Sequence, residues 1–209
     1  KEIHMSTMIA DPETYFQRLL PERSTLLLRL EKEAADAEIP IVGPVVGELL
    51  YILARFGRAQ RMLELGAATG YSAIYLAAAG RDVKGYLVTL ESDPELARRA
   101  EDNLVEAGLE GHARVVCGDA LTWLTRTAER FDFVFMDIEK EDYIKTLPGL
   151  ENVITPGGLL VADNVAFEDA DPFNRAMFRN PAWRSVSLHA LLPGHSPRYD
   201  GLCLAVRTA

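Results

Sequence analysis

The chain has 209 residues, of which 48% are hydrophobic and 25% charged, with a formal net charge of −9. This composition is typical of one soluble globular domain with a sizeable core, and the acidic balance argues against a general nucleic-acid binder, which needs surplus Lys and Arg. Cys117 and Cys203 lie in apolar runs that suggest neither a disulfide scaffold nor a zinc site, and the start of the chain lacks a signal-peptide pattern. No apolar stretch is long enough to span a bilayer. We therefore expect a cytoplasmic protein that does not act in a membrane.

Three helices are expected before the first strand. Asp11-Pro12-Glu13 has the form of a helix N-cap with a first-turn proline, and this helix should end before Pro21. Ser24–Ala37 and Val45–Phe56 carry apolar residues at helical spacing, with a proline-containing linker between them. Because these helices precede the sheet, we predict that residues 1–60 form a helical lid or interface, and that residues 61–209 form the core of a single domain.

From Arg61 onward, strand-like and helix-like stretches alternate. The expected strands are Arg61–Leu65, Gly85–Glu91, Ala113–Cys117, Phe131–Asp137 and Gly158–Asp163, and the helices between them are Tyr71–Ala79, Pro94–Ala107, Ala120–Ala128 and Tyr143–Val153. Apolar strands separated by helix-length segments predict a parallel sheet with helices on both faces. Two later strands, Trp183–Leu191 and Leu202–Arg207, are close enough in sequence to form a hairpin and hence an antiparallel edge. The predicted fold class is α/β: a Rossmann-like, seven-stranded, mostly parallel sheet with an antiparallel C-terminal edge strand and extra N-terminal helices.

A glycine-marked turn follows the first expected strand. The strand carries Glu64 and passes through Gly66-Ala-Ala-Thr-Gly70 into a helix, an arrangement that brings backbone N–H groups and an acid to a nucleotide-like ligand. Glu91 lies about twenty residues further on, where an acid can accept hydrogen bonds from ribose hydroxyls. A dinucleotide pyrophosphate needs a middle glycine where this turn has Ala68. Glu64 would repel a pyrophosphate but could meet an ammonium group, so the turn favours S-adenosylmethionine over NAD.

Polar residues also follow the fourth and fifth expected strands. Asp137 ends one of them, and Asp163-Asn164 ends the next. Two carboxylates and an amide oxygen suit a hard divalent ion such as Mg²⁺, or another cation such as Mn²⁺ or Ca²⁺. No His or Cys stands beside them in the sequence, which argues against zinc. Taken alone, each acid is more often a helix cap or a turn residue, so the prediction depends on their common position at the strand ends.

Three stretches of the chain resemble the cation-dependent O-methyltransferases, a group that includes catechol and caffeoyl-CoA O-methyltransferases. They are Leu63–Ser72, Phe131–Tyr143 and Pro156–Asn164, which occur in the family's order and at family-like spacing. The resemblance covers the chain from about Ile39 to Arg207. It implies an S-adenosylmethionine donor, a divalent cation, a small hydroxylated acceptor and a homodimer through the N-terminal helices.

The resemblance also implies a role for each matched residue. Asp137, Asp163 and Asn164 would hold the cation, and Lys140 would be the catalytic base. Lys140, Asn164 and Asp200 would face the acceptor. The donor would be contacted by Val42, Glu64, Gly66, Ala67, Gly70, Ser72, Glu91, Asp119, Ala120 and Asp137. The implied reaction is methyl transfer to a hydroxyl oxygen, best that of a catechol-like molecule.

Alternatives stay open at this point. The same chemistry could methylate a hydroxylated uridine in tRNA, because the linker Ile39–Val42 looks like that of such relatives and a local basic face could form from Arg18, Arg23, Arg29, Arg55, Arg58 and Arg61. An NAD-dependent oxidoreductase and a non-catalytic S-adenosylmethionine-binding protein are weaker alternatives. Glu168 stands where many members of the family have an amide or a glycine. This difference indicates that the methyl acceptor of this protein is not the plant-type acceptor. His195, in Pro-Gly-His-Ser-Pro, is interpreted as an exposed loop residue rather than a second acid/base.

Overall fold

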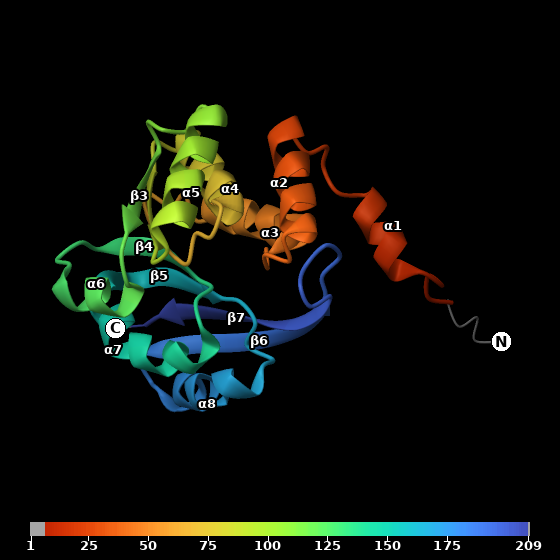
Figure 1. The fold of residues 1–209 in the computed structure, drawn as a ribbon. Coiled ribbons are helices and arrows are strands. Elements are labelled where there is room, and N and C mark those ends of the chain that lie inside the picture. Colours follow the sequence, from red (N-terminus) through yellow and green to blue (C-terminus); the bar gives the residue numbers. More distant parts are fainter. Residues whose placement is uncertain (1–6, 209) are drawn as a thin grey trace, which may run out of the picture.

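A seven-stranded sheet runs through the centre of the computed structural model, which describes residues 7–208 (Figure 1). The strand order is β3-β2-β1-β4-β5-β7-β6. The strands are β1 (Arg61–Leu65), β2 (Tyr86–Glu91), β3 (Ala113–Cys117), β4 (Phe131–Met136), β5 (Ile154–Ala162), β6 (Trp183–Leu191) and β7 (Tyr199–Arg207). Strands β1 to β5 are parallel, and β7 runs antiparallel between β5 and β6. The predicted mostly parallel sheet with an antiparallel C-terminal edge is therefore confirmed.

Helices cover both faces of this sheet (Figure 1). They are α1 (Pro12–Arg18), α2 (Thr25–Asp36), α3 (Gly43–Phe56), α4 (Tyr71–Arg81), α5 (Pro94–Glu106), α6 (Ala120–Arg126), α7 (Tyr143–Val153) and α8 (Asp171–Arg179), with short 3₁₀ turns η1 (Lys140–Asp142) and η2 (Glu168–Ala170). Helices α3, α4 and α5 lie on one face and α6, α7 and α8 on the other, while α1 extends away from the body. None of the helices within residues 7–208 combines the length and hydrophobicity needed to span a lipid bilayer.

Alternate residues of the central strands supply two separate cores. Met62 and Phe133 pack into the core under α3, α4 and α5, whereas Leu63 and Val134 pack into the core under α6, α7 and α8. Successive side chains of a strand point to opposite faces. A strand covered on both faces is therefore apolar throughout, which explains why these strands read as continuous hydrophobic runs.

Two differences from the predicted elements have clear physical reasons. Strand β5 begins at Ile154 rather than Gly158, because Ile154 already pairs with Phe131 of β4. The pairing then shifts register before Leu159, and Gly157 has a φ of +83° within this irregular part. Helix α8 was not predicted, although it begins with Asp171-Pro172, the same start signal as α1. Residues 1–6 of the predicted lid segment, and Ala209, lie outside the described residues.

The strand order places a topological switch point beside β1. From β1 the chain adds β2 and β3 on one side and then β4 and β5 on the other. In an open α/β sheet, a crevice forms outside the carboxyl ends of the strands at such a point, and ligands bind there.

Candidate functional site

The glycine turn after β1 lies directly against the end of β4. Gly66 has a φ of +95°, and a Cβ atom on it would stand 2.0 Å from the backbone carbonyl oxygen of Asp137. The Gly66 and Ala67 amides donate to the Leu90 carbonyl at 3.0 and 2.9 Å, and the Asp137 amide donates to the Leu65 carbonyl at 2.9 Å. Only glycine allows this conformation and this approach, so the turn and Asp137 form one structural unit.

Glu64 is fully buried near the end of β1. Its Oε2 accepts a hydrogen bond from the Thr89 hydroxyl, while Oε1 has no hydrogen-bond partner. Burial raises the pKa of Glu64 to about 7; the Thr89 and Ser72 hydroxyls oppose this shift, and the charges of Asp137 and Glu91 add to it. A buried acceptor without a partner is costly, and a cationic group of a ligand would satisfy it.

Glu91 holds the far side of the turn. Its Oε2 accepts from the Ala68 amide at 2.8 Å and its Oε1 from the Asp93 amide at 2.9 Å. Ala68 has a φ of +45°, a left-handed conformation that is uncommon for a residue with a side chain. The Glu91 carboxylate thus stabilises the turn on its ligand-facing side.

A cavity of about 340 Å³ opens beside the turn and joins it to the residues after β4. Eight of the ten residues predicted to contact the donor line it: Val42, Gly66, Ala67, Ser72, Glu91, Asp119, Ala120 and Asp137. Lys140 lines it as well. Glu64 and Gly70 are not among the lining residues. Gly70 instead begins α4 with a φ of +85°, and a Cβ there would stand 3.1 Å from the Ala100 Cα.

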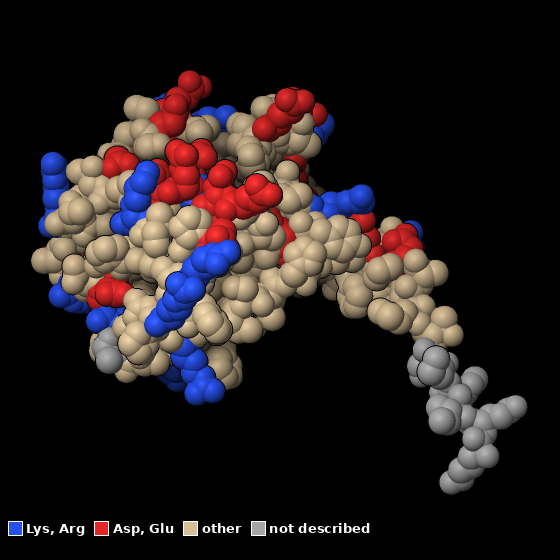
Figure 2. Space-filling view, turned by 90° about the horizontal axis from the view of Figure 1, so that it is seen from below, with Lys and Arg blue, Asp and Glu red and all other residues tan. Residues whose placement is uncertain are grey.

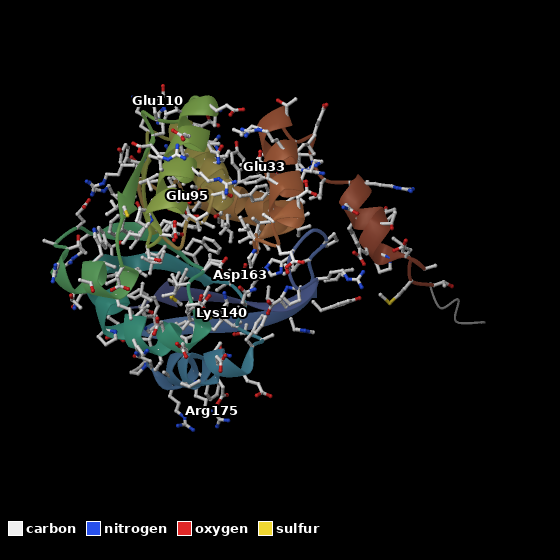
Figure 3. All side chains as sticks on the ribbon, in the orientation of Figure 1. Glu33, Glu95, Glu110, Lys140, Asp163 and Arg175 are labelled. Carbon is white, nitrogen blue, oxygen red and sulfur yellow. The ribbon has the colours of Figure 1, made fainter. Side chains whose placement is uncertain are left out.

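Asp137 and Lys140 form an ion pair at the cavity wall. The Lys140 Nζ donates to the Asp137 Oδ1 at 2.9 Å. Burial and the neighbouring charge of Asp163 raise the pKa of Asp137, while the charges of Lys140 and His195 oppose the shift. Figure 3 places Lys140 and Asp163 close to one another near the centre of the molecule. The structure therefore brings the predicted base and two predicted metal ligands into one electrostatic group.

Asp163 is buried, and contacts on several sides hold it in place. Its Oδ1 accepts from the Asn164 amide at 2.8 Å, and its Oδ2 lies 2.9 Å from the His195 Nε2. Its backbone carbonyl accepts from the Tyr143 hydroxyl at 3.0 Å. Tyr143 is itself buried, so α7 helps to fix the end of β5.

Asn164 follows in the left-handed conformation, with a φ of +51°. Its Nδ2 donates to the Asp200 Oδ2 at 2.6 Å. Asp200 is fully buried at the start of β7, and its Oδ1 accepts from the Gly201 amide at 2.6 Å. Because a carboxylate only accepts hydrogen bonds, Asp200 determines which end of the Asn164 side chain is the amide oxygen.

The interpretation of His195 as an exposed loop residue is wrong. Its side chain is buried, with 5% of the residue exposed, because the loop between β6 and β7 folds back onto the ends of β5 and α3. The Nδ1 atom lies 2.6 Å from the Pro197 carbonyl oxygen. Burial lowers the pKa of the imidazole, but the hydrogen bond to Asp163 and its charge outweigh this effect, so the pKa is raised.

The position of His195 also bears on the argument against zinc, which rests on the absence of His and Cys beside Asp137 and Asp163 in the sequence. In the fold, ligand atoms of Asp163, His195 and Asp200 all lie within 4.8 Å of one another. The sequence contained one signal for this cluster: the Pro-Gly-His-Ser-Pro loop lies just before the Asp200-Gly201 pair.

The arginines proposed for a basic face are largely neutralised. Of those six, four form ion pairs: Arg23 with Glu31, Arg29 with Glu33 and Glu106, Arg55 with Asp82, and Arg61 with Glu129. Figure 2 shows acidic side chains gathered near the middle of one face of the molecule. Glu168 lies exposed in η2. These features do not favour a polyanionic partner.

Comparison with known proteins identifies close relatives of this chain. A model of a family described as O-methyltransferase matches residues 21–172. A catechol O-methyltransferase of Niastella koreensis is 32% identical over 212 residues, with 92% of this chain and 94% of that protein covered. Two crystal structures are 27% identical: an O-methyltransferase of Bacillus cereus in complex with SAH, with a TM-score of 0.84 and coverage of 94% of this chain and 97% of that one, and TomG of Streptomyces achromogenes in complex with SAM, with a TM-score of 0.85 and coverage of 97% and 100%.

Proposed function

This chain belongs to the O-methyltransferase family and is an S-adenosylmethionine-dependent enzyme, and we propose that it methylates a hydroxyl oxygen of a small catechol-like acceptor with the help of a divalent cation. The observation that carries the proposal is that one and the same cavity is lined by the glycine turn and by Asp137 and Lys140. This cavity therefore combines a site for the methyl donor with the Asp137–Lys140 ion pair. Family membership argues against the NAD-dependent alternative.

The donor half of the cavity fits S-adenosylmethionine. Gly66, Ala67 and Ser72 line the part of the cavity that would take the methionine end. Glu64 is buried and does not line the cavity itself, but its unpaired oxygen suits the ammonium group of that end. Gly70 contributes by turning the chain into α4. Glu91 is suited to the ribose hydroxyls, and Asp119 and Ala120 to the adenine. Val42, at the start of α3, covers the cavity from the N-terminal side.

Asp137 lines the cavity, whereas Asp163 and Asn164 are buried at the end of β5 and are not among its lining residues. Together these three residues have the donor set of a cation site. Asp137, Asp163 and Asn164 would supply oxygen ligands, which suit Mg²⁺, Mn²⁺ or Ca²⁺. A cation there would supply positive charge that favours the deprotonated form of an acceptor hydroxyl. In its neutral form, Lys140 takes the hydroxyl proton, and the Asp137 carboxylate 2.9 Å from its Nζ holds the amine in place. Asn164 and Asp200, which are buried and outside the cavity lining, would complete the acceptor side.

We further propose that residues 1–60 act as a lid on a single catalytic domain and that the lid helices join two copies in a homodimer. The support is an exposed apolar set on and beside α1: Tyr15, Phe16 and Leu19. Exposed aromatic side chains grouped in this way often mark an interaction surface. Sedimentation analysis of the full chain and of a Phe16→Ser variant tests this; a monomeric wild type contradicts it.

The test of function is methyl transfer from isotopically labelled S-adenosylmethionine to a catechol panel, with and without EDTA. We expect transfer to catechols that EDTA abolishes, and that Asp137→Ala abolishes as well. Hypomethylated tRNA is the second arm, because a hydroxylated uridine is the alternative acceptor. Transfer to tRNA alone would overturn the small-molecule proposal, and undiminished transfer in EDTA would overturn the cation dependence.

A further inference from the structure

We propose that His195 is a nitrogen ligand in the cation site, through its Nε2 atom beside Asp163, and that the site consequently selects Mn²⁺ or Co²⁺ over Mg²⁺ and Ca²⁺. The inference rests on the proposed function only in taking Asp163 as a cation ligand. It adds a residue from the β6–β7 loop to a site otherwise built from the ends of β4 and β5.

The two carboxylate oxygens of Asp163 have different partners. The Oδ1 atom already accepts the Asn164 amide at 2.8 Å. Among the described side chains, the His195 ring is the hydrogen-bond partner of Oδ2, with Nε2 at 2.9 Å. A cation that binds Asp163 through Oδ2 therefore lies beside Nε2 and replaces the proton that the two atoms share.

The contacts of the His195 ring determine which of its two nitrogens carries a hydrogen. Nδ1 lies 2.6 Å from the Pro197 carbonyl oxygen, which only accepts, so Nδ1 carries a hydrogen. Metal-binding histidines usually donate the other ring N–H to a backbone carbonyl or a carboxylate in this way. Nε2 is then the nitrogen that binds a cation, and its proton leaves to solvent.

The His195 ring cannot easily turn away from Asp163. The His195 amide donates to the Leu192 carbonyl at 2.9 Å, and Leu192 in turn donates to the Arg198 carbonyl at 2.7 Å. A Cβ on Gly194 would stand 2.7 Å from the Pro44 Cδ, so the loop is packed tightly on α3. With its side chain 1% exposed, the His195 ring stays beside Asp163.

Distance and chemistry then indicate the class of ion. The 2.9 Å between Nε2 and Oδ2 is the length of an N–H···O hydrogen bond. It is also compatible with two neighbouring ligands of one ion, because ligand atoms about 2.1 Å from a metal and at right angles lie about 3 Å apart. Right angles between neighbouring ligands are those of octahedral coordination. Imidazole suits Mn²⁺ less than Co²⁺ but binds both better than it binds Mg²⁺ or Ca²⁺, which prefer oxygen alone.

The experiment detects the nitrogen directly, without an activity assay. The chain has four histidines, so replacing His4, His112 and His189 by alanine leaves His195 alone. Electron spin-echo spectroscopy of this triple variant with bound Mn²⁺ should show imidazole ¹⁴N coupling. The same measurement on His195→Ala should not, and His189→Ala, which alters an exposed histidine of β6, serves as the matched control.

Calorimetric titration with Mn²⁺ and Mg²⁺ gives the second readout. We expect His195→Ala to lower Mn²⁺ affinity by about 10–100-fold, the range seen when a supporting group of a metal site is lost, and to lower Mg²⁺ affinity less. The inference is overturned if the triple variant lacks nitrogen coupling, or if His195→Ala leaves the Mn²⁺/Mg²⁺ ratio unchanged. Nitrogen coupling without any methyl transfer would instead count against the proposed function alone. The triple variant keeps the test valid even if His195→Ala does not fold.

Discussion

The Asn164 side chain donates to the Asp200 carboxylate at 2.6 Å, with both residues buried. This contact connects the end of β5 to the start of β7, two strands that run in opposite directions. Orienting contacts of this kind support a metal site by holding a ligand's oxygen in place. The site thus depends on the C-terminal hairpin as well as on the parallel strands.

Replacing Asp200 by Asn should weaken cation binding and stability together. The new amide can accept from Asn164 only if its NH₂ faces the Gly201 N–H, which leaves two donors opposed. We expect a loss of about 1–3 kcal/mol in the free energy of unfolding and about 10–100-fold in cation affinity, measured by urea denaturation and calorimetry. Asp169→Asn, at an exposed acid, should change neither by more than about 0.5 kcal/mol. Equal effects of the two variants would contradict the orienting role of Asp200.

Lys140 and Lys145 provide a matched pair for the catalytic base. Each forms an ion pair with an acid three residues earlier, Asp137 and Asp142, but only Lys140 lines the cavity. We expect Lys140→Ala to lower kcat by about 10²–10⁴-fold, the range for loss of a general base, without weakening donor binding. Lys145→Ala should retain wild-type kcat. Comparable losses in both variants, or a Lys140→Ala effect confined to KM, would argue against proton transfer by Lys140.

Glu64 predicts a pH dependence of donor binding. Its pKa is raised to about 7 in the donor-free protein, and an ammonium group pairs only with the ionised carboxylate. Affinity for S-adenosylhomocysteine should therefore level off above pH 7 and fall by up to about tenfold per pH unit below it. Calorimetry between pH 5.5 and 8 measures this. Glu64→Gln should bind weakly with a flat profile, whereas Glu110→Gln, at an exposed acid, should follow the wild type.

The same shift predicts the opposite trend for stability. An acid whose folded pKa lies above its unfolded value of 4.5 binds its proton better in the folded state. The contribution of Glu64 to the free energy of unfolding should thus decline by about 3 kcal/mol as the pH rises from about 4.5 to 7. Denaturation of donor-free wild type and Glu64→Gln across this range isolates the effect; parallel pH profiles would contradict it.

The sheet and the strand-end acids of the site can be predicted from the sequence for the same physical reason. Parallel strands align their carboxyl ends, so acids at strand ends such as Asp137 and Asp163 must gather at one edge whatever the details of packing. The place of His195 follows no such rule, because it depends on how a loop 32 residues beyond Asp163 folds back against α3. The burial of Asp200 depends likewise on β7 pairing directly with β5. Periodicity along the chain carries no signal for either contact.

The contact between Gly43 and Gly194 offers a test of how that loop is held. A Cβ on Gly43 would stand 2.3 Å from the Gly194 carbonyl oxygen, and Gly43 has a φ of +67°. Gly108 has nearly the same φ, +66°, but open space around it. Gly108→Ala should thus cost about 1–2 kcal/mol from the left-handed conformation alone, and Gly43→Ala should cost about 1–3 kcal/mol more, because backbone atoms must move. By shifting the loop, Gly43→Ala should also displace His195 from Asp163 and weaken Mn²⁺ binding, an effect that Gly108→Ala should lack. Urea denaturation and Mn²⁺ titration of both variants measure these differences, and equal costs with unchanged Mn²⁺ affinity would show that the loop does not depend on α3 for its position.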